Sequence, residues 1–334
     1  TVGDVELPVP TGAMHAALPR DRIPAIVEPE FGPDWRDVDA PTGTTRPLLP
    51  GDTPVIGVVR GESARAYPLR ILDWHEVVND DFGGPLLVTY CVLCGSAVVA
   101  ERRVAGRPTI FGVSGYLWRD DLVLYDRATE SLWSQLLATA VNGPRTGDRL
   151  SLVPASLTTW AEFRRAHPTG DVLLPPPHSS TVAGRERTFN YLDPKYSYGD
   201  EDQLIGYDSA GALESRTLVV GVEHDGAATA YPFGTVRAAD VINDRVGGLP
   251  VVVTLTPGGS MAAYVRRVGG ETVAVEPDGE RFMTAAGSRW ERETGRAVDG
   301  PHEGRSLEPA TDRSPMFWLG WSNFHPDTAV YERD

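Results

Sequence analysis

Cys91 and Cys94 are the residues whose types and spacing most directly suggest chemistry. They are the two cysteines of the chain, they lie in the segment TYCVLCGSAV (89–98) at the end of an apolar run, and Gly95 follows the second thiol. Two thiolates at this spacing, with a glycine turn after them, form a knuckle that directs both sulfurs toward one point. Such a pair can serve as a disulfide, a redox couple, part of a zinc knuckle or two ligands of a reactive metal.

The surrounding sequence favours a reactive metal site over the other three roles. A structural zinc site normally has four protein ligands, and the chain has no second cysteine pair to complete one. A thioredoxin-like redox pair lies at the N-terminus of a helix, which lowers the pKa of its first thiol, whereas this pair follows an apolar run typical of a strand. A labile disulfide, a redox pair and inert packing stay open as alternatives.

An internal duplication provides a control for choosing further ligands. Residues 57–84 align without a gap with residues 221–248 at a constant offset of 164, and eleven of the 28 positions are identical. The shared positions include a Tyr-Pro pair, an Asn-Asp pair and a Gly-Gly pair, which are typical of turns and element ends. We infer that the duplicated residues are mainly scaffold and that functional residues are those which differ.

Three possible metal ligands of the first copy are absent together from the second copy. The counterparts of His75, Cys91 and Cys94 at the same offset are Ala239, Leu255 and Gly258. We therefore predict one metal ion held by His75, Cys91 and Cys94, with a fourth position open to solvent, oxygen or substrate. Thiolate-rich sites of low coordination number favour Cu(I), and zinc is the competing metal.

The first copy also has a segment, SGYLWRD (114–120), that the second copy lacks. An extra loop in the ligand-bearing unit could be a substrate-facing lid or a neutral insertion. Asp126 and Gln135 follow it and align with Met283 and Arg292, so they are candidates to line a substrate pocket, with solvated polar residues as the alternative. His178 is a weaker candidate ligand.

The pattern of elements predicts an α+β, β-rich fold. Each copy reads as a strand-helix-strand unit, with a helix from about residue 71 to residue 80 that ends at Gly83-Gly84, and with strands over 86–90 and after the cysteines. A second short helix is predicted within 158–168. We expect the two copies to pack as one pseudo-twofold body. The predicted organisation is an extended N-terminal arm (1–50), repeat unit one (51–174), a connector (175–215) and repeat unit two without metal ligands (216–334).

Composition limits the classes of partner. The chain of 334 residues is 41% hydrophobic and carries a net charge of −15, so it should form a large buried core and is a poor candidate for binding nucleic acid. It has no apolar stretch of about 18 residues, so no membrane-spanning segment is expected. The chain begins at Thr1, which suggests a processed or shortened chain from which a signal peptide would be missing. The compartment and the oligomeric state are left open.

The chain resembles a bacterial and archaeal family catalogued as domain of unknown function 3179. The resemblance rests on the Cys-x-x-Cys-Gly-Ser run at 91–96, FGVSG (111–115), SLWSQ (131–135) and AYPLRILDWHEVVND (66–80), and it extends from about residue 56 to the C-terminus. Many members of that family resemble exported or lipid-anchored proteins. The family name implies no activity.

From the residues we predict a copper-dependent oxidoreductase that acts on a small organic molecule with O2. In this hypothesis His75, Cys91 and Cys94 hold the copper ion, and Asp126 and Gln135 orient the substrate. A zinc-dependent hydrolase or lyase and a copper carrier without catalysis are the alternatives.

Overall fold

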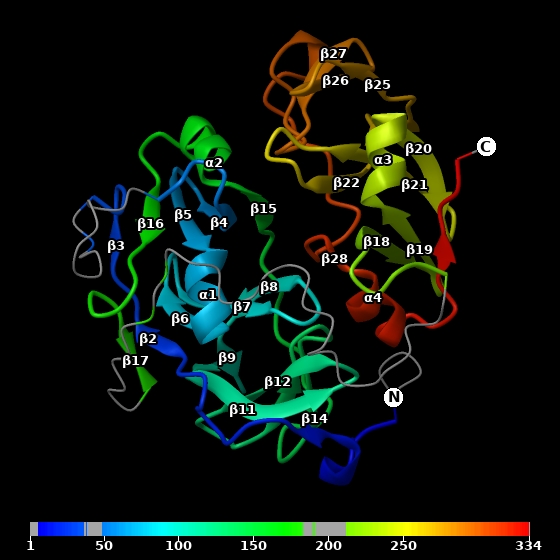
Figure 1. The fold of residues 1–334 in the computed structure, drawn as a ribbon. Coiled ribbons are helices and arrows are strands. Elements are labelled where there is room, and N and C mark those ends of the chain that lie inside the picture. Colours follow the sequence, from blue (N-terminus) through cyan, green and yellow to red (C-terminus); the bar gives the residue numbers. More distant parts are fainter. Residues whose placement is uncertain are drawn as a thin grey trace.

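The chain forms a six-bladed β-propeller in a computed structural model that describes residues 6–36, 38, 49–182, 189, 191 and 212–333. Strands make up 44% of the structure and helices only 12%, so the predicted α+β body built from two strand-helix-strand units is wrong. The α-helices among the described residues are too short to form a layer of their own, because each of these four has seven residues. They lie at the ends and edges of sheets (Figure 1).

Three sheets contain the strands of the first repeat, β4 to β16. The first sheet has the order β15 (Ser156–Thr159), β4 (Pro54–Arg60), β5 (Ser63–Pro68), β16 (Asp171–Leu173), β3 (Phe31–Gly32). The second has the order β17 (Ser180–Thr181), β2 (Ile26–Glu28), β6 (Val77–Asp81), β7 (Pro85–Cys91), β8 (Ser96–Glu101). The third has the order β1 (His15–Ala16), β11 (Phe111–Trp118), β12 (Asp121–Asp126), β13 (Leu132–Ser134), β14 (Thr139–Asn142). A small hairpin pairs β9 (Arg103–Val104) with β10 (Arg107–Pro108).

Three further sheets contain the strands of the second repeat, β18 to β29. Their orders are β28 (Met316–Phe317), β18 (Leu218–His224), β19 (Ala227–Pro232), β29 (Ala329–Val330); then β20 (Val241–Val246), β21 (Leu249–Leu255), β22 (Met261–Val265); then β25 (Glu276–Asp278), β26 (Phe282–Ala285), β27 (Ser288–Glu291). A small hairpin pairs β23 (Arg267–Val268) with β24 (Glu271–Thr272). Two short 3-10 helices, Thr11–Ala13 and Gly300–His302, complete the described elements.

The four α-helices occupy matching places in the two repeats. Helices α1 (Leu69–His75) and α3 (Phe233–Ala239) follow β5 and β19, and their bounds differ by the same offset of 164 that relates the two sequences. Helices α2 (Trp160–Ala166) and α4 (Trp318–Phe324) follow β15 and β28. Each repeat is therefore three sheets with two short helices, and the sequence repeat corresponds to half of the propeller.

The predicted helix over 71–80 is wrong in its extent. Helix α1 ends at His75, because Glu76 adopts a left-handed conformation (φ 56°) and the β-branched Val77 and Val78 continue as strand β6. The glycines expected to stop the helix instead form the tight turn between β6 and β7, with φ values of 62° and 124° at Gly83 and Gly84. The prediction of a helix within 158–168 is close to α2, whose first turn is capped by the Thr159 side chain.

The described part of the N-terminal region supplies one strand to each five-stranded sheet of the first repeat, and β1 and β3 lie at the edges of their sheets. Strand β1 pairs with β11, β2 pairs with β6, and β3 pairs with β16. The described residues contain no helix that is both long enough and apolar enough to cross a membrane.

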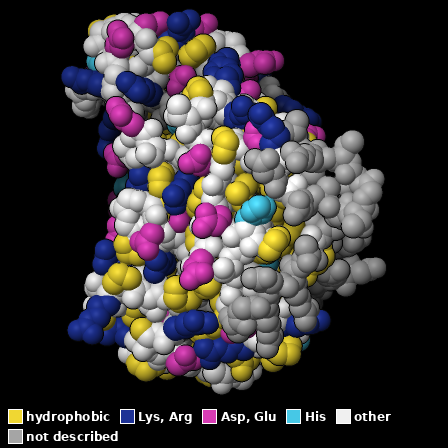
Figure 2. Space-filling view, turned by 90° about the vertical axis from the view of Figure 1, so that its left-hand side faces the viewer, with side chains coloured by type: hydrophobic (Ala, Val, Ile, Leu, Met, Phe, Trp, Pro, Cys, Tyr) yellow, Lys and Arg dark blue, Asp and Glu magenta, His cyan; other side chains and the backbone are white. Residues whose placement is uncertain are grey.

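One hydrophobic core cluster joins the two repeats. It contains Cys91, Cys94 and Trp118 of the first repeat together with Trp318 and Trp321 of the second. Helix α4 lies on the side of the second repeat that faces the first (Figure 1). On the face shown in Figure 2, acidic and basic side chains are interspersed and no continuous basic patch is visible.

Candidate metal centre

The cysteine knuckle is the turn between the central strand β7 and strand β8. Cys91 is the last residue of β7 and pairs with Ser96, the first residue of β8, so Cys94 lies on the turn directly beside it. Gly95 closes the turn with φ 59°, and a Cβ atom there would lie 2.8 Å from the ring of Phe317. The glycine is therefore required both for the turn and for the packing of the second repeat against it.

A hairpin turn from the third sheet lies over the two sulfurs. Strands β11 and β12 are joined by Arg119 and Asp120, both with positive φ (53° and 59°), as in the two-residue turns that match the twist of a hairpin. The Cys94 thiol donates to the carbonyl oxygen of Asp120 at 3.1 Å, and the Cys91 thiol does so at 3.8 Å. The extra segment 114–120 of the first repeat therefore ends in the turn that contacts the cysteines.

Asp121, the first residue of β12, completes a group of three potential metal ligands. The sulfurs of Cys91 and Cys94 and a carboxylate oxygen of Asp121 all lie within 4.8 Å of one another. All three side chains are buried, and both thiols are free. Two thiolates and one carboxylate are a donor set that suits copper or zinc.

The carboxylate of Asp121 is only half satisfied by protein donors. Its Oδ2 accepts hydrogen bonds from Ser134 Oγ at 2.9 Å and from Leu136 N at 3.0 Å, whereas its buried Oδ1 has no partner among the described residues. Burial raises the pKa of Asp121 to about 7, although the N–H groups of Leu136 and Leu122, the hydroxyl of Ser134 and the charge of Arg313 oppose the shift. An unsatisfied buried carboxylate oxygen is costly, and a cation bound there would remove that cost.

The charges of the group point the same way. The neighbouring Cys91 thiol, burial, and the carboxylates of Asp121 and Asp120 together raise the pKa of Cys94 well above its usual range. Two thiols and a carboxyl group gathered in an apolar core are an arrangement that a positive ion stabilises, because the ion favours the anionic form of each ligand.

Helix α4 of the second repeat closes the site. The backbone N–H of Phe317, just before the helix, donates to the carbonyl oxygen of Cys94 at 2.8 Å. A Cβ atom at Gly320 would lie 2.9 Å from Cys94 Cβ and 3.5 Å from its sulfur, so only glycine fits without displacement. Asn323 and Arg119 exchange hydrogen bonds at 2.8 and 2.9 Å, which fixes the hairpin turn against the helix.

A family model described as "Protein of unknown function (DUF3179)" matches residues 20–328. The chain belongs to this family. The resemblance seen in the sequence is thereby confirmed, and the match spans both repeats of the DUF3179 chain. The search of curated proteins and the search of solved structures found no match.

His75, the predicted third ligand, lies outside the group of three ligands. Its Nδ1 is 2.7 Å from the carbonyl oxygen of Pro24, and its Nε2 is 2.8 Å from the hydroxyl of Tyr191. The imidazole is fully buried and stacks on the Tyr191 ring. The ring packs between Pro24 of the N-terminal region and Tyr191. Each of its two nitrogens is therefore within hydrogen-bond distance of an oxygen atom. Asp121, instead of His75, lies beside the sulfurs of Cys91 and Cys94.

Asp126 is held entirely by its own hairpin. Its two carboxylate oxygens accept hydrogen bonds from Thr129 N and Thr129 Oγ1, both at 2.7 Å, and from Trp133 Nε1 at 3.0 Å. The strand pairing also aligns Leu124, not Asp126, with Met283, since Trp133 pairs with Leu124 and Trp290 pairs with Met283. A role in orienting substrate stays a prediction, and the geometry gives Asp126 a role in fixing the turn.

Gln135 lies under the knuckle instead of in an open pocket. Its Nε2 donates to Thr89 Oγ1 and to the carbonyl oxygen of Ser96, both at 3.1 Å, and its Oε1 accepts from Ser96 Oγ at 3.0 Å. These bonds tie β13 to both strands of the cysteine hairpin. His178 is exposed and its backbone N–H donates to Pro175, so the described structure gives it no place at the metal site.

Sequence comparison of the two copies missed Asp121 because the adjoining hairpin has no gap-free counterpart in the second repeat. Strand β11 has eight residues, whereas β25 has three. The sequence feature that could have indicated Asp121 is its position directly after the segment 114–120, which only the copy with the cysteines contains.

Proposed function

We propose that the DUF3179 chain binds one copper ion between Cys91, Cys94 and Asp121, and that this centre oxidises a small organic molecule with O2 as the electron acceptor. The observation that carries the proposal is the meeting of two free thiols and a half-satisfied carboxylate in one buried group. His75 is replaced in the proposed ligand set by Asp121. The rest of the chain positions the three ligands and keeps water away from them.

The donor set supports copper over zinc. Two thiolates in an apolar core form a soft site of low coordination number, which Cu(I) accepts readily, whereas structural zinc requires four donors. Among the described residues the group offers three side-chain donors. A zinc centre with a bound water as fourth ligand is the alternative, and it would support hydrolysis or elimination.

Burial supports a resident cofactor over a carrier. The exposed fractions of Cys91 and Cys94 are 2% and 0%, and helix α4 covers the knuckle. A carrier passes its ion to a partner by ligand exchange, which requires accessible sulfurs. An ion bound here would instead exchange slowly and stay with the protein.

A dithiol–disulfide couple is a second candidate function. Two free thiols beside a carboxyl group whose pKa is raised to about 7 by burial could lose and regain electrons, with Asp121 as the proton acceptor. The same burial weighs against it, because disulfide exchange needs a partner sulfur to reach one of the thiols.

Metal analysis of protein purified without chelator tests the proposal. We expect about one copper per chain in the wild type, and loss of that copper in the Cys91→Ser/Cys94→Ser double variant and in Asp121→Asn. Asp120→Asn is the matched control, because it removes the adjacent carboxylate while leaving the three ligands, and it should retain copper. Full copper content in the double variant would refute the site, and stoichiometric zinc in place of copper would refute the choice of metal.

A further inference from the structure

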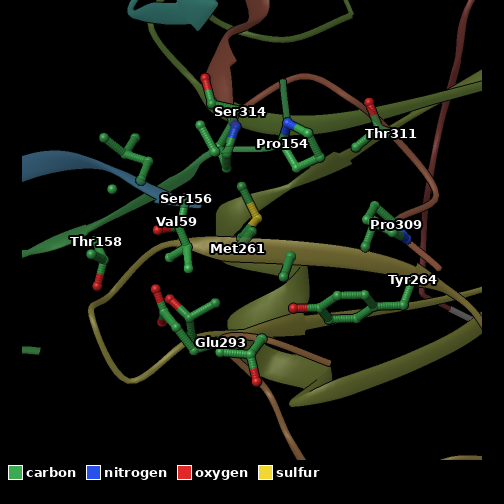
Figure 3. A pocket seen from close by; sticks show the side chains of 18 of the residues that line it. Val59, Pro154, Ser156, Thr158, Met261, Tyr264, Glu293, Pro309, Thr311 and Ser314 are labelled. Carbon is green, nitrogen blue, oxygen red and sulfur yellow. The ribbon is translucent and has the colours of Figure 1, made fainter. Parts of the chain in front are cut away.

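A cavity of about 420 Å³ lies where the two repeats meet. Its lining comes from β4 and the β15–α2 segment of the first repeat and from β22, the segment after β27 and the residues before β28 of the second. Figure 3 shows Thr158, Met261 and Glu293 around it. Its volume is in the range of small-molecule sites.

The cavity lies beside the turn of the second repeat that corresponds to the cysteine knuckle, because Thr256 and Met261 of that turn line it. Gly258 corresponds to Cys94 at the offset of 164, and a Cβ atom there would lie 2.2 Å from Thr158 Oγ1. Thr158 lies just before helix α2, as Phe317 lies just before helix α4. The cysteine turn of the first repeat is thus contacted by the β28–α4 segment of the second repeat, and the corresponding turn of the second repeat is contacted by the β15–α2 segment of the first.

Glu293 is the unsatisfied polar group of the cavity. Both of its carboxylate oxygens are buried, and neither has a hydrogen-bond partner among the described residues. Thr158 Oγ1 is buried without a partner as well. Burial raises the pKa of Glu293 to about 7. The hydroxyls of Thr158 and Thr256, which approach the carboxylate without reaching hydrogen-bond geometry, and the positive charge of Arg165 offset only part of this shift. A group that donates hydrogen bonds and carries positive charge is what this arrangement lacks.

Two of the other charged side chains of the lining, Glu162 and Arg313, have opposite or polar partners, whereas Arg296 and Asp312 are exposed to solvent. Glu162 pairs with Arg165 at 2.7 Å, and Arg313 lies 3.0 Å from His325 Nε2 in the field of Glu223. The remaining wall is largely apolar and includes Val59, Pro154, Phe163, Val220 and Met261. The cavity therefore combines a buried carboxyl group that lacks a hydrogen-bond partner among the described residues with a largely apolar surface.

We propose that this cavity binds a small primary amine with an apolar body. The ammonium group donates to the carboxylate of Glu293, with the hydroxyl of Thr158 as a further acceptor, and the apolar body packs on Val59 and Met261. An ammonium ion has three donors, which matches two carboxylate oxygens and one hydroxyl oxygen. The proposal does not depend on the metal at Cys91 and Cys94.

Isothermal titration of the full chain at pH 8 with butylamine, hexylamine, benzylamine and phenethylamine tests the proposal. We expect at least one amine to bind, and 2-phenylethanol and 3-phenylpropionate to bind at least tenfold more weakly than phenethylamine. Glu293→Gln should weaken amine binding at least tenfold, and Thr158→Val should weaken it severalfold. Glu303→Gln, which changes an exposed glutamate, should leave it unchanged.

The Cys91→Ser/Cys94→Ser variant should also bind amines with unchanged affinity, which separates this test from that of the metal site. Thermal melts establish that each variant is folded before titration. Failure of all four amines to bind the wild type would overturn the proposal. Equal binding of phenethylamine by Glu293→Gln, or equal binding of the alcohol or the carboxylate, would overturn it too.

Discussion

At the scale of single residues, Asp121 distinguishes a metal centre from a mere pair of thiols. Its Oδ2 is fixed by Ser134 and by the backbone of Leu136, while its Oδ1 lacks a partner. A carboxylate held on one side and open on the other is oriented in advance for a ligand, as the outer-shell contacts of metal sites usually ensure. Ser134 is therefore expected to strengthen metal binding by orienting Asp121, although it is not itself a ligand.

Ser134→Ala should lower copper affinity about 10- to 100-fold, because outer-shell hydrogen bonds typically have that effect. Competition with a copper chelator of known affinity measures the change. Ser131→Ala is the matched control, since Ser131 is equally buried but bonds to Thr129 and Arg145 instead of the site. Equal affinity in the two variants would contradict the orienting role of Ser134.

The raised pKa of Asp121 also predicts how the metal-free protein responds to pH. Because burial raises the pKa from an ordinary value near 3.8 to about 7, the folded state favours the protonated carboxyl group. The stabilisation is complete below the unfolded pKa and is lost as the pH rises through 7. At about 1.4 kcal/mol per pKa unit, the loss between pH 4 and pH 8 is on the order of 4 kcal/mol.

Denaturant unfolding of metal-free wild type and Asp121→Asn at several pH values checks this prediction. The free energy of unfolding of the variant should fall less steeply between pH 4 and pH 8 than that of the wild type. The two curves must be compared directly, because burial raises the pKa of Asp120 and Glu293 as well. Parallel curves would show that Asp121 ionises normally in the folded protein.

At the scale of elements, helix α4 holds the cysteine knuckle in place. Gly320 is the point of closest approach, because a Cβ atom there would lie 2.9 Å from Cys94 Cβ. Gly320→Ala should therefore destabilise the protein by about 1–3 kcal/mol, as overpacking commonly does, and should also weaken copper binding. Gly234→Ala is the control within helix α3, where an added Cβ meets nothing within 4 Å. Thermal and chemical unfolding report the difference, and an unaffected Gly320→Ala protein would argue against close packing on the sulfur.

Local elements were predictable from the sequence only where local signals agreed. Strand β7 and helix α2 were expected near their observed places, because an apolar run and a Thr-capped amphipathic segment mark them. Helix α1 was predicted too long, since the left-handed conformation of Glu76 is not marked by a glycine. The proximity of Asp121 to the sulfurs depends on how the β11–β12 hairpin packs on another sheet, and no spacing within the chain encodes that contact directly.

At the scale of the whole molecule, the two repeats form one structure. The core cluster that contains both cysteines also contains Met316, Trp318 and Trp321 of the second repeat. The duplication was visible in the sequence, whereas the propeller was not, because single strands reveal their partners only after the sheets assemble. The prediction that two strand-helix-strand units pack into one α+β body is wrong, because the strands assemble into the blades of a propeller.

The shared core predicts that both repeats unfold in one transition. Copper at about 100 times its Kd should stabilise that single transition by about 2.7 kcal/mol, because the ion binds only the folded state. Calorimetry with and without copper measures this, and Cys91→Ser/Cys94→Ser should show one transition without the copper-dependent shift. Two separate transitions, only one of which responds to copper, would contradict the shared core.

The most direct test of the central claim is an anomalous-scattering map at the copper edge, from crystals of protein purified without chelator. We predict a single anomalous peak, within coordination distance of the sulfurs of Cys91 and Cys94 and of a carboxylate oxygen of Asp121. A map with no peak between these three side chains, a disulfide joining the two cysteines, or a peak at the imidazole of His75 would contradict it.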